Sequence, residues 1–108
     1  MIRNMSINSD FIVGTFTKEA RKRFLDTYLI RRGEKSPGEI LLKSNNLDGF
    51  SKIYTYKKTK ISDPWESYSS SDWEEEKTIK NKLNKIVNID QDIWVIELDD
   101  KKGNSPNF

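Results

Sequence analysis

The chain has 108 residues, with 19 Lys and Arg against 17 Asp and Glu, and it contains neither His nor Cys. Without these two residue types, Ser-His-Asp and Cys-His catalysis, disulfides and Cys/His zinc sites are excluded. The length suits a single domain over residues 1–108. No apolar run approaches the roughly 20 residues that span a bilayer, and the start shows no apolar stretch of signal-peptide length. We therefore expect a cytoplasmic protein with no membrane association.

The first half of the chain predicts one strand followed by one helix. Residues 10–16 are rich in β-branched and aromatic side chains, which favour a strand. Over residues 17–32, Ala20, Phe24 and Tyr28 recur at every fourth position. This spacing makes one apolar stripe and predicts an amphipathic helix.

Two strands follow the predicted helix. A Pro and a Gly mark a turn at residues 34–38, and residues 39–43 then form a short strand. A longer strand runs from residue 50 to about residue 61. Because side chains alternate along a strand, Tyr54 and Tyr56 share one of its faces.

The second half predicts a loop, a helix and a last strand. Residues 62–71 are rich in Ser and form the loop, and a Ser-x-x-Glu capping box at residues 71–74 starts a helix that ends near residue 88. Residues 92–98 contain four consecutive apolar residues, a pattern typical of a strand covered on both faces. Residues 101–108 are expected to form a flexible, frayed tail.

The resulting order is strand, helix, strand, strand, helix, strand. It predicts a single small α+β domain with an antiparallel sheet and two helices. The order also matches the ferredoxin-like βαββαβ plan, in which both helices cover one face of the sheet.

Charge is divided unevenly along the chain. Residues 1–60 carry a net charge of +7 and residues 61–108 a net charge of −5. The near-neutral total therefore hides two segments of opposite sign. These segments either pair within one chain, meet across subunits of a homo-oligomer, or attract external partners.

The acidic segment contains the preferred candidate site, a protein-binding surface in which acidic residues surround three aromatic ones. Trp and Tyr often dominate the binding energy of protein interfaces, and acidic neighbours steer association towards a protein with a basic surface. The alternative is that the tryptophans fold back onto the core. The candidate residues are Trp65, Glu66, Tyr68, Asp72, Trp73, Glu74, Glu75 and Glu76.

The basic segment supports a second hypothesis, an RNA- or DNA-binding module. Exposed tyrosines on a strand stack on bases, while neighbouring cations contact phosphates. The basic helix cluster is expected in the first turns of the helix over residues 17–32. The alternative is an ordinary half-buried strand whose tyrosines pack on a helix. The candidate residues are Arg21, Lys22, Arg23, Tyr54, Tyr56, Lys57 and Lys58.

Catalytic, metal and nucleotide sites find little support. The carboxylates near the last strand lack the spacing of a calcium loop, and the five glycines never cluster into a phosphate-binding loop. We therefore predict a non-enzymatic protein without cofactor or metal. We expect it to bind and modulate or inhibit another macromolecule, and the preferred partner is a protein, as for inhibitors, toxin-immunity proteins and phage counter-defence proteins. Nucleic-acid binding is the alternative.

Overall fold

The computed structural model describes residues 8–35 and 38–108. Residues 1–7, for which no apolar signal stretch was expected, and residues 36–37 of the predicted turn lie outside these ranges. In chain order the elements are helix α1 (Ser9–Lys22), strands β1 (Asp26–Arg31), β2 (Ile40–Asn45), β3 (Phe50–Tyr56) and β4 (Trp65–Ser67), a 3-10 turn (Tyr68–Ser70), strand β5 (Glu74–Glu75), helix α2 (Glu76–Ile89) and strand β6 (Trp94–Asp99).

The strands within the described ranges form one sheet. Their order is β1-β6-β2-β3-β4, and β5 also pairs with β3. Neighbouring strands are antiparallel except β2 and β6, which run parallel. The predicted α+β class with two helices is confirmed, and the sheet, predicted as antiparallel, is mixed and mostly antiparallel.

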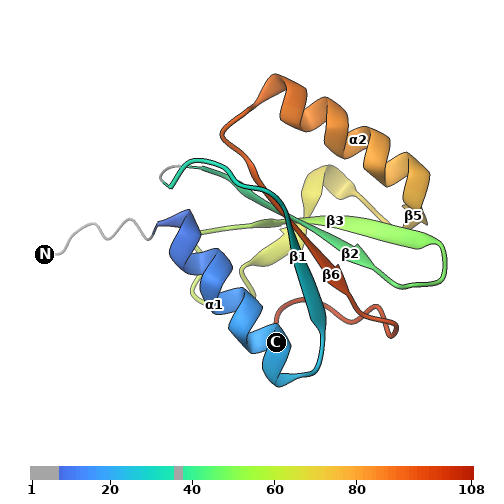
Figure 1. Cartoon of the computed structure of the whole chain (residues 1–108), viewed down its shortest axis with the longest axis horizontal. Helices are drawn as coiled ribbons and strands as arrows, with labels where there is room; N and C mark the ends of the chain where they lie inside the picture. The colour runs from blue at the N-terminus through green and yellow to red at the C-terminus, as the bar shows by residue number, and fades with distance from the viewer. Residues whose placement is uncertain (1–7, 36–37) are drawn as a thin grey trace, which may run out of the picture.

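The two helices cover opposite faces of this sheet (Figure 1). One buried cluster joins α1 to even-numbered strand residues such as Leu42 and Ile96. The other joins α2 to odd-numbered residues such as Leu41 and Val95. Both clusters arise because successive strand residues point to opposite faces. The expectation that both helices share one face is therefore wrong.

The ferredoxin-like order is also wrong, because its first strand and helix are displaced along the chain. Residues 10–16, predicted as a strand, lie inside α1, and residues 26–31, predicted as helix, form β1. Ile12, Phe16 and Ala20 stand four residues apart and form the buried stripe of α1. This stripe outweighs the strand preference of the individual side chains.

The later elements lie close to their predicted positions. β2 and β6 match the expected strands, whereas β3 ends at Tyr56, earlier than expected. The predicted loop at residues 62–71 also contains β4 and the 3-10 turn. α2 begins at Glu76, after the predicted capping box, and the residue before it, Glu75, forms no side-chain capping hydrogen bond.

The last eight residues, expected to fray, are held against the core. Asn107 Oδ1 accepts a hydrogen bond from the Trp65 backbone N–H (2.8 Å), and its Nδ2 donates to the Trp65 carbonyl oxygen (2.9 Å). The Phe108 ring stacks on Phe16 with 5.3 Å between ring centroids, and Pro106 is buried. These contacts anchor the C-terminal segment beside α1 and β4.

Candidate protein-binding surface

Trp65, the first aromatic residue of the predicted acidic-aromatic site, belongs to the core. Its side chain is 5% exposed, and its ring meets those of Phe16 and Tyr56 edge-on, with centroids 5.2 Å and 5.0 Å away. Of the two alternatives for this tryptophan, folding back onto the core is the one observed. A ring buried to this extent does not serve as an exposed binding anchor.

The other two aromatic residues of that site are half-buried. Tyr68 packs against the cluster beneath α2. Trp73 covers Gly103, where a Cβ would lie 3.3 Å from the indole ring and where φ is +62°. Glycine suits this position because of both its left-handed backbone and its closeness to the ring. Both aromatic residues thus contribute to the packing of the chain.

Most acidic residues of the predicted site already have partners within the chain. Three ion pairs join Glu66 to Lys60 (3.0 Å), Glu74 to Lys82 (2.7 Å) and Glu76 to Lys43. Asp72 accepts a hydrogen bond from the backbone N–H of Trp73 (2.8 Å), and Glu75 is exposed. The structure therefore places these eight residues along one segment but does not assemble them into an exposed aromatic surface.

The nucleic-acid candidates are also divided between the core and the surface. Tyr54 is 8% exposed, and Tyr56 packs against Trp65, so neither presents a free face for base stacking. Lys57 and Lys58 are exposed, and the Lys58 ammonium group donates to the Ser9 hydroxyl (3.0 Å).

The basic helix cluster lies at the end of α1, not in the first turns as expected. Arg21 and Lys22 occupy the last turn, where cations stabilise a helix through its dipole. Lys22 and Arg23 also pair with Glu19, at 3.1 Å and 3.0 Å. Local helix stability accounts for these positive charges.

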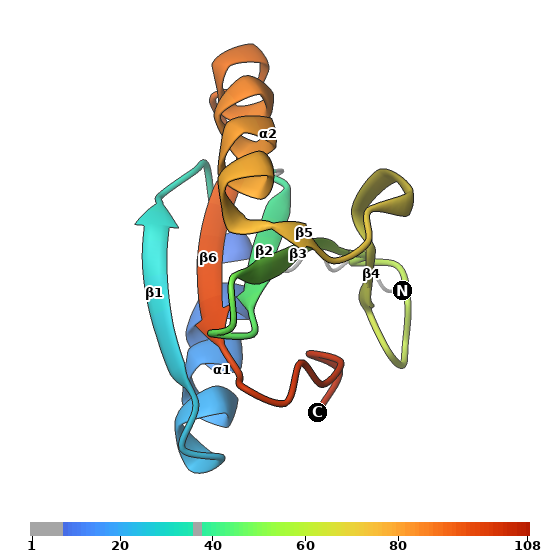
Figure 2. The ribbon, with the colours of Figure 1, turned by 90° about the vertical axis from the view of Figure 1, so that its right-hand side faces the viewer.

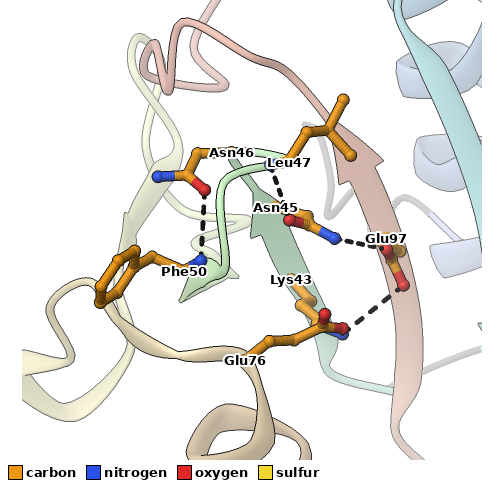
Figure 3. A network of polar contacts seen from close by, with 7 residues as sticks. All are labelled: Lys43, Asn45, Asn46, Leu47, Phe50, Glu76 and Glu97. Atoms are coloured by element: carbon orange, nitrogen blue, oxygen red, sulfur yellow. Dashed lines mark hydrogen bonds and ion pairs between the residues drawn. The ribbon is translucent and has the colours of Figure 1, made fainter.

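A polar network centred on the buried Lys43, which was not predicted from the sequence, lies between α2, β2 and β6 (Figure 3). The Lys43 side chain is 7% exposed and lies between Glu76 and Glu97, with 3.7 Å from its Nζ to Glu97 Oε1. Asn45 Nδ2 donates to Glu97 Oε2 (3.3 Å). The pairing matters because a buried ammonium group without a partner is strongly destabilising.

Asp99, two residues beyond Glu97 on the same face of β6, has a pKa raised to about 6. Burial is the main cause, followed by the hydrogen bond that a protonated Asp99 donates to Glu97 and by the negative charges of Glu97 and Asp26. Lys43 opposes this rise. Carboxylates thus crowd at this end of β6, although no metal-binding group of acidic residues is found in the described ranges.

The hairpin between β2 and β3 presents a leucine on a firmly held turn (Figure 3). Leu47 has a φ of +62°, its side chain is 52% exposed, and its backbone N–H donates to Asn45 Oδ1 (2.8 Å). Asn46 Oδ1 accepts from the N–H groups of Asp48 (2.8 Å) and Phe50 (3.2 Å). Side-chain bonds of this kind stabilise tight turns and hold Leu47 in a fixed position.

The end of α1 presents a second large apolar side chain. Phe24 has a φ of +59° and is 96% exposed. Its N–H donates to the Arg21 carbonyl (2.9 Å), and the Leu25 N–H donates to the Ala20 carbonyl (3.0 Å). This pattern is a Schellman motif, in which the position of Phe24 is normally occupied by glycine.

Phe24 and Leu47 line the same groove, which we call the Phe24–Leu47 groove. Its volume is about 550 Å³, and its lining residues come from the α1–β1 turn, the β2–β3 hairpin and the C-terminal segment. Figure 2 shows these three segments towards the lower end of the view. Phe108 adds a third apolar side chain, 37% exposed. Charged residues of both signs surround the apolar ones: Arg23, Asp26, Asp99, Asp100, Lys101 and Lys102.

Neither of the two residues that define this groove was among the predicted binding residues. The sequence pattern placed Phe24 on the apolar stripe of a longer helix and gave no role to Leu47. The Asn-Asn-Leu-Asp-Gly sequence offered one signal, since a leucine inside a turn rich in Asn, Asp and Gly has little local reason to be there. No comparable signal marks Phe24.

The fold and its surface define a small α+β domain with a mixed sheet, and none of its described helices is long and apolar enough to cross a membrane. The chain belongs to the DUF1491 family, described as "Protein of unknown function", which matches residues 7–107. A comparison with curated protein sequences finds no match.

Three solved structures are similar to this chain. A DUF1491 family protein from Caulobacter crescentus CB15, with a crystal structure at 1.87 Å resolution, is 22% identical over 94% of both chains, with a TM-score of 0.75. An NMR structure of a DUF1491 family protein from the same organism is 21% identical, covering 96% of this chain and 94% of that one, with a TM-score of 0.71. A solution structure from A. tumefaciens is 17% identical, covering 95% and 93%, with a TM-score of 0.75. At these identities they show the shared fold alone.

Proposed function

We propose that this chain is a non-catalytic binding protein that docks on another protein through the Phe24–Leu47 groove. One observation carries the proposal: two large, exposed apolar side chains beside the same groove both stand on left-handed backbone. The other non-glycine residues with positive φ in the described ranges are Asp63 and Ser69, which are small and polar.

Folding stability alone does not favour Phe24 and Leu47 at these positions. A left-handed conformation costs a non-glycine residue roughly 1–2 kcal/mol. An exposed apolar side chain recovers little of this cost by burial, because it stays in water. Strained backbone that persists in this way is typical of binding and catalytic sites. A protein partner that covers both side chains supplies the missing burial.

The groove has the general composition of a protein interface. Apolar side chains lie among charged ones, as the core and rim of an interface do. Because the turn at Leu47 is held by side-chain hydrogen bonds, little conformational entropy is lost when a partner binds. Cations and carboxylates both line the groove, so the predicted basic partner surface stays a prediction. The inhibitor, toxin-immunity, phage counter-defence and cytoplasmic assignments stay predictions as well.

The test compares partner capture by the wild-type chain and by a Phe24→Gly/Leu47→Gly variant from nuclease-treated native lysate. We expect the variant to lose a partner that the wild type retains, while its thermal stability is unchanged or higher. Ser69→Gly is the matched control, since it relieves a left-handed residue outside the groove (φ +48°) and keeps both apolar side chains. Equal capture by the wild type and the double variant contradicts the proposal.

A further inference from the structure

The outer edge of the sheet at β1 is open and apolar. Among the described residues β1 pairs with β6 alone, and Figure 2 shows it at the margin of the sheet. Tyr28, Leu29 and Ile30 are 49%, 50% and 57% exposed. An edge strand with unpaired backbone groups and apolar side chains is a template for pairing with another strand.

A bulge in β1 brings its two terminal charges to the same face. Asp26 and Tyr28 pair with Asp99 and Glu97, on the face that α2 covers. The register then shifts between Leu29 and Arg31, so that Arg31 stands opposite Val95, again on the α2 face. Without this bulge, Arg31 would point to the opposite face from Asp26, because strand side chains alternate.

We propose that β1 pairs antiparallel with β1 of a second copy of this chain, forming a homodimer with one continuous sheet. The two-fold axis stands perpendicular to the sheet and passes midway between the two β1 strands, at the level of Tyr28. Tyr28 then lies opposite Tyr28 of the second copy, and Thr27 lies opposite Leu29. Because Ile30 is the extra residue of the bulge and stays unpaired, Asp26 lies opposite Arg31. The side chains of every pair share a face, as antiparallel pairing requires.

Charge complementarity favours a second copy as the occupant of this edge. Two Asp26–Arg31 pairs form across the seam, one on each side of the axis. Asp26 lies in an acidic environment, where its charge and that of Asp99 raise the pKa of Tyr28. The Arg31 side chain of the second copy offsets the repulsion between the Asp26 and Asp99 carboxylates. Opposite charges on facing residues of neighbouring strands also stabilise the strand pairing. The seam is independent of the Phe24–Leu47 groove, although Asp26 borders both.

The seam is short, so we expect the dimer to depend on protein concentration. Sedimentation of the wild type is expected to shift from a mass of 12.7 kDa towards twice that value as the concentration rises to about 1 mM. A mass that stays at that of one chain over this whole range overturns the proposal.

Single cysteine substitutions test the register directly, because the chain contains no cysteine. Residues opposite one another in an antiparallel pair have Cα atoms about 4.5–5.5 Å apart, within reach of a disulfide. With diamide as the two-electron oxidant, Tyr28→Cys is expected to cross-link to itself at least about tenfold faster than Ile61→Cys, a fully exposed control outside the seam. Equal rates for the two variants overturn the proposal.

A second pair of variants distinguishes this register from loose association. In the proposed register Thr27 lies about 8 Å from its own counterpart, too far for a disulfide, but directly opposite Leu29. Thr27→Cys is therefore expected to cross-link poorly to itself and rapidly to a Leu29→Cys chain. Rapid self-cross-linking of Thr27→Cys contradicts the register.

A charge exchange probes the two ion pairs. Asp26→Arg alone places cations opposite one another and is expected to dissociate the dimer, whereas Asp26→Arg combined with Arg31→Asp is expected to restore it. Arg31 also donates to the Gln91 carbonyl within its own chain (2.8 Å), so a thermal melt checks that the double variant folds. A folded double variant that stays monomeric counts against the Asp26–Arg31 pairs.

Discussion

Large apolar side chains are buried in one region of this molecule, around Trp65, and exposed in another, the Phe24–Leu47 groove. Around Trp65 the rings pack on one another, and charged neighbours such as Glu66 pair within the chain. In the Phe24–Leu47 groove the two side chains for which it is named stay exposed and stand on strained backbone. Aromatic content therefore does not locate a binding surface. Burial and backbone conformation together separate side chains that hold the fold from those left for a partner.

The largest expected effect comes from truncating the buried tryptophan. Trp65→Ala removes a ring that contacts Phe16 and Tyr56, and large-to-small changes of this kind cost about 3–5 kcal/mol. We expect a loss of this size in urea unfolding at unchanged m-value. The matched control is Phe50→Ala, because Phe50 is 43% exposed. A Trp65→Ala loss no greater than that of Phe50→Ala would place Trp65 at the surface and remove the contrast between the regions.

The α+β class was predictable from the sequence, but the topology was not. The later elements have clear local signals, such as the four apolar residues of β6 and the apolar face of α2. In the first half an apolar residue recurs at every fourth position from Ile12 to Tyr28. Periodicity alone therefore does not show where the helix ends. It ends because Phe24 adopts a left-handed conformation, which its residue type does not predict.

The binding surface was less predictable than the fold. Tryptophan is a residue type that is common in protein interfaces. Only tertiary packing shows that Trp65 is buried and that Trp73 covers Gly103. Lys43 gives no sign in the sequence that it is buried between glutamates from α2 and β6. Both outcomes depend on contacts between residues far apart in the chain, which local patterns do not encode.

An intermediate effect on stability is expected at Asp99, which also lines the Phe24–Leu47 groove. Unlike Phe24 and Leu47, Asp99 lowers stability through a raised pKa and not through strained backbone. Its pKa rises from 3.8 to about 6 on folding. Between these values the folded chain keeps a proton that the unfolded chain has released. Stability therefore falls as the pH rises through this range, and the loss persists above it.

Asp99→Asn removes this titration. Because solvent screens the partly exposed carboxyl group, we expect the variant to be only about 1 kcal/mol more stable than the wild type near pH 7. Near pH 4 the two proteins are expected to have similar stability. Thermal unfolding across this range measures the difference, with Asp92→Asn, at an exposed position, as the control. An Asp99→Asn protein that keeps the wild-type slope would show that other groups cause it.

The smallest effect on stability is expected at Phe24. It bears most directly on the comparison between the buried region around Trp65 and the exposed groove. Phe24→Gly relieves the left-handed conformation and is expected to raise the free energy of unfolding by about 0.5–1 kcal/mol. Phe24→Ala removes the same ring but keeps a Cβ, so it retains the strain and should not be stabilised. Thermal unfolding of the three proteins separates the backbone from the ring. A stability that falls in both variants would mean that the Phe24 ring supports the fold, as Trp65 does, and would leave no unexplained strain for a partner to offset.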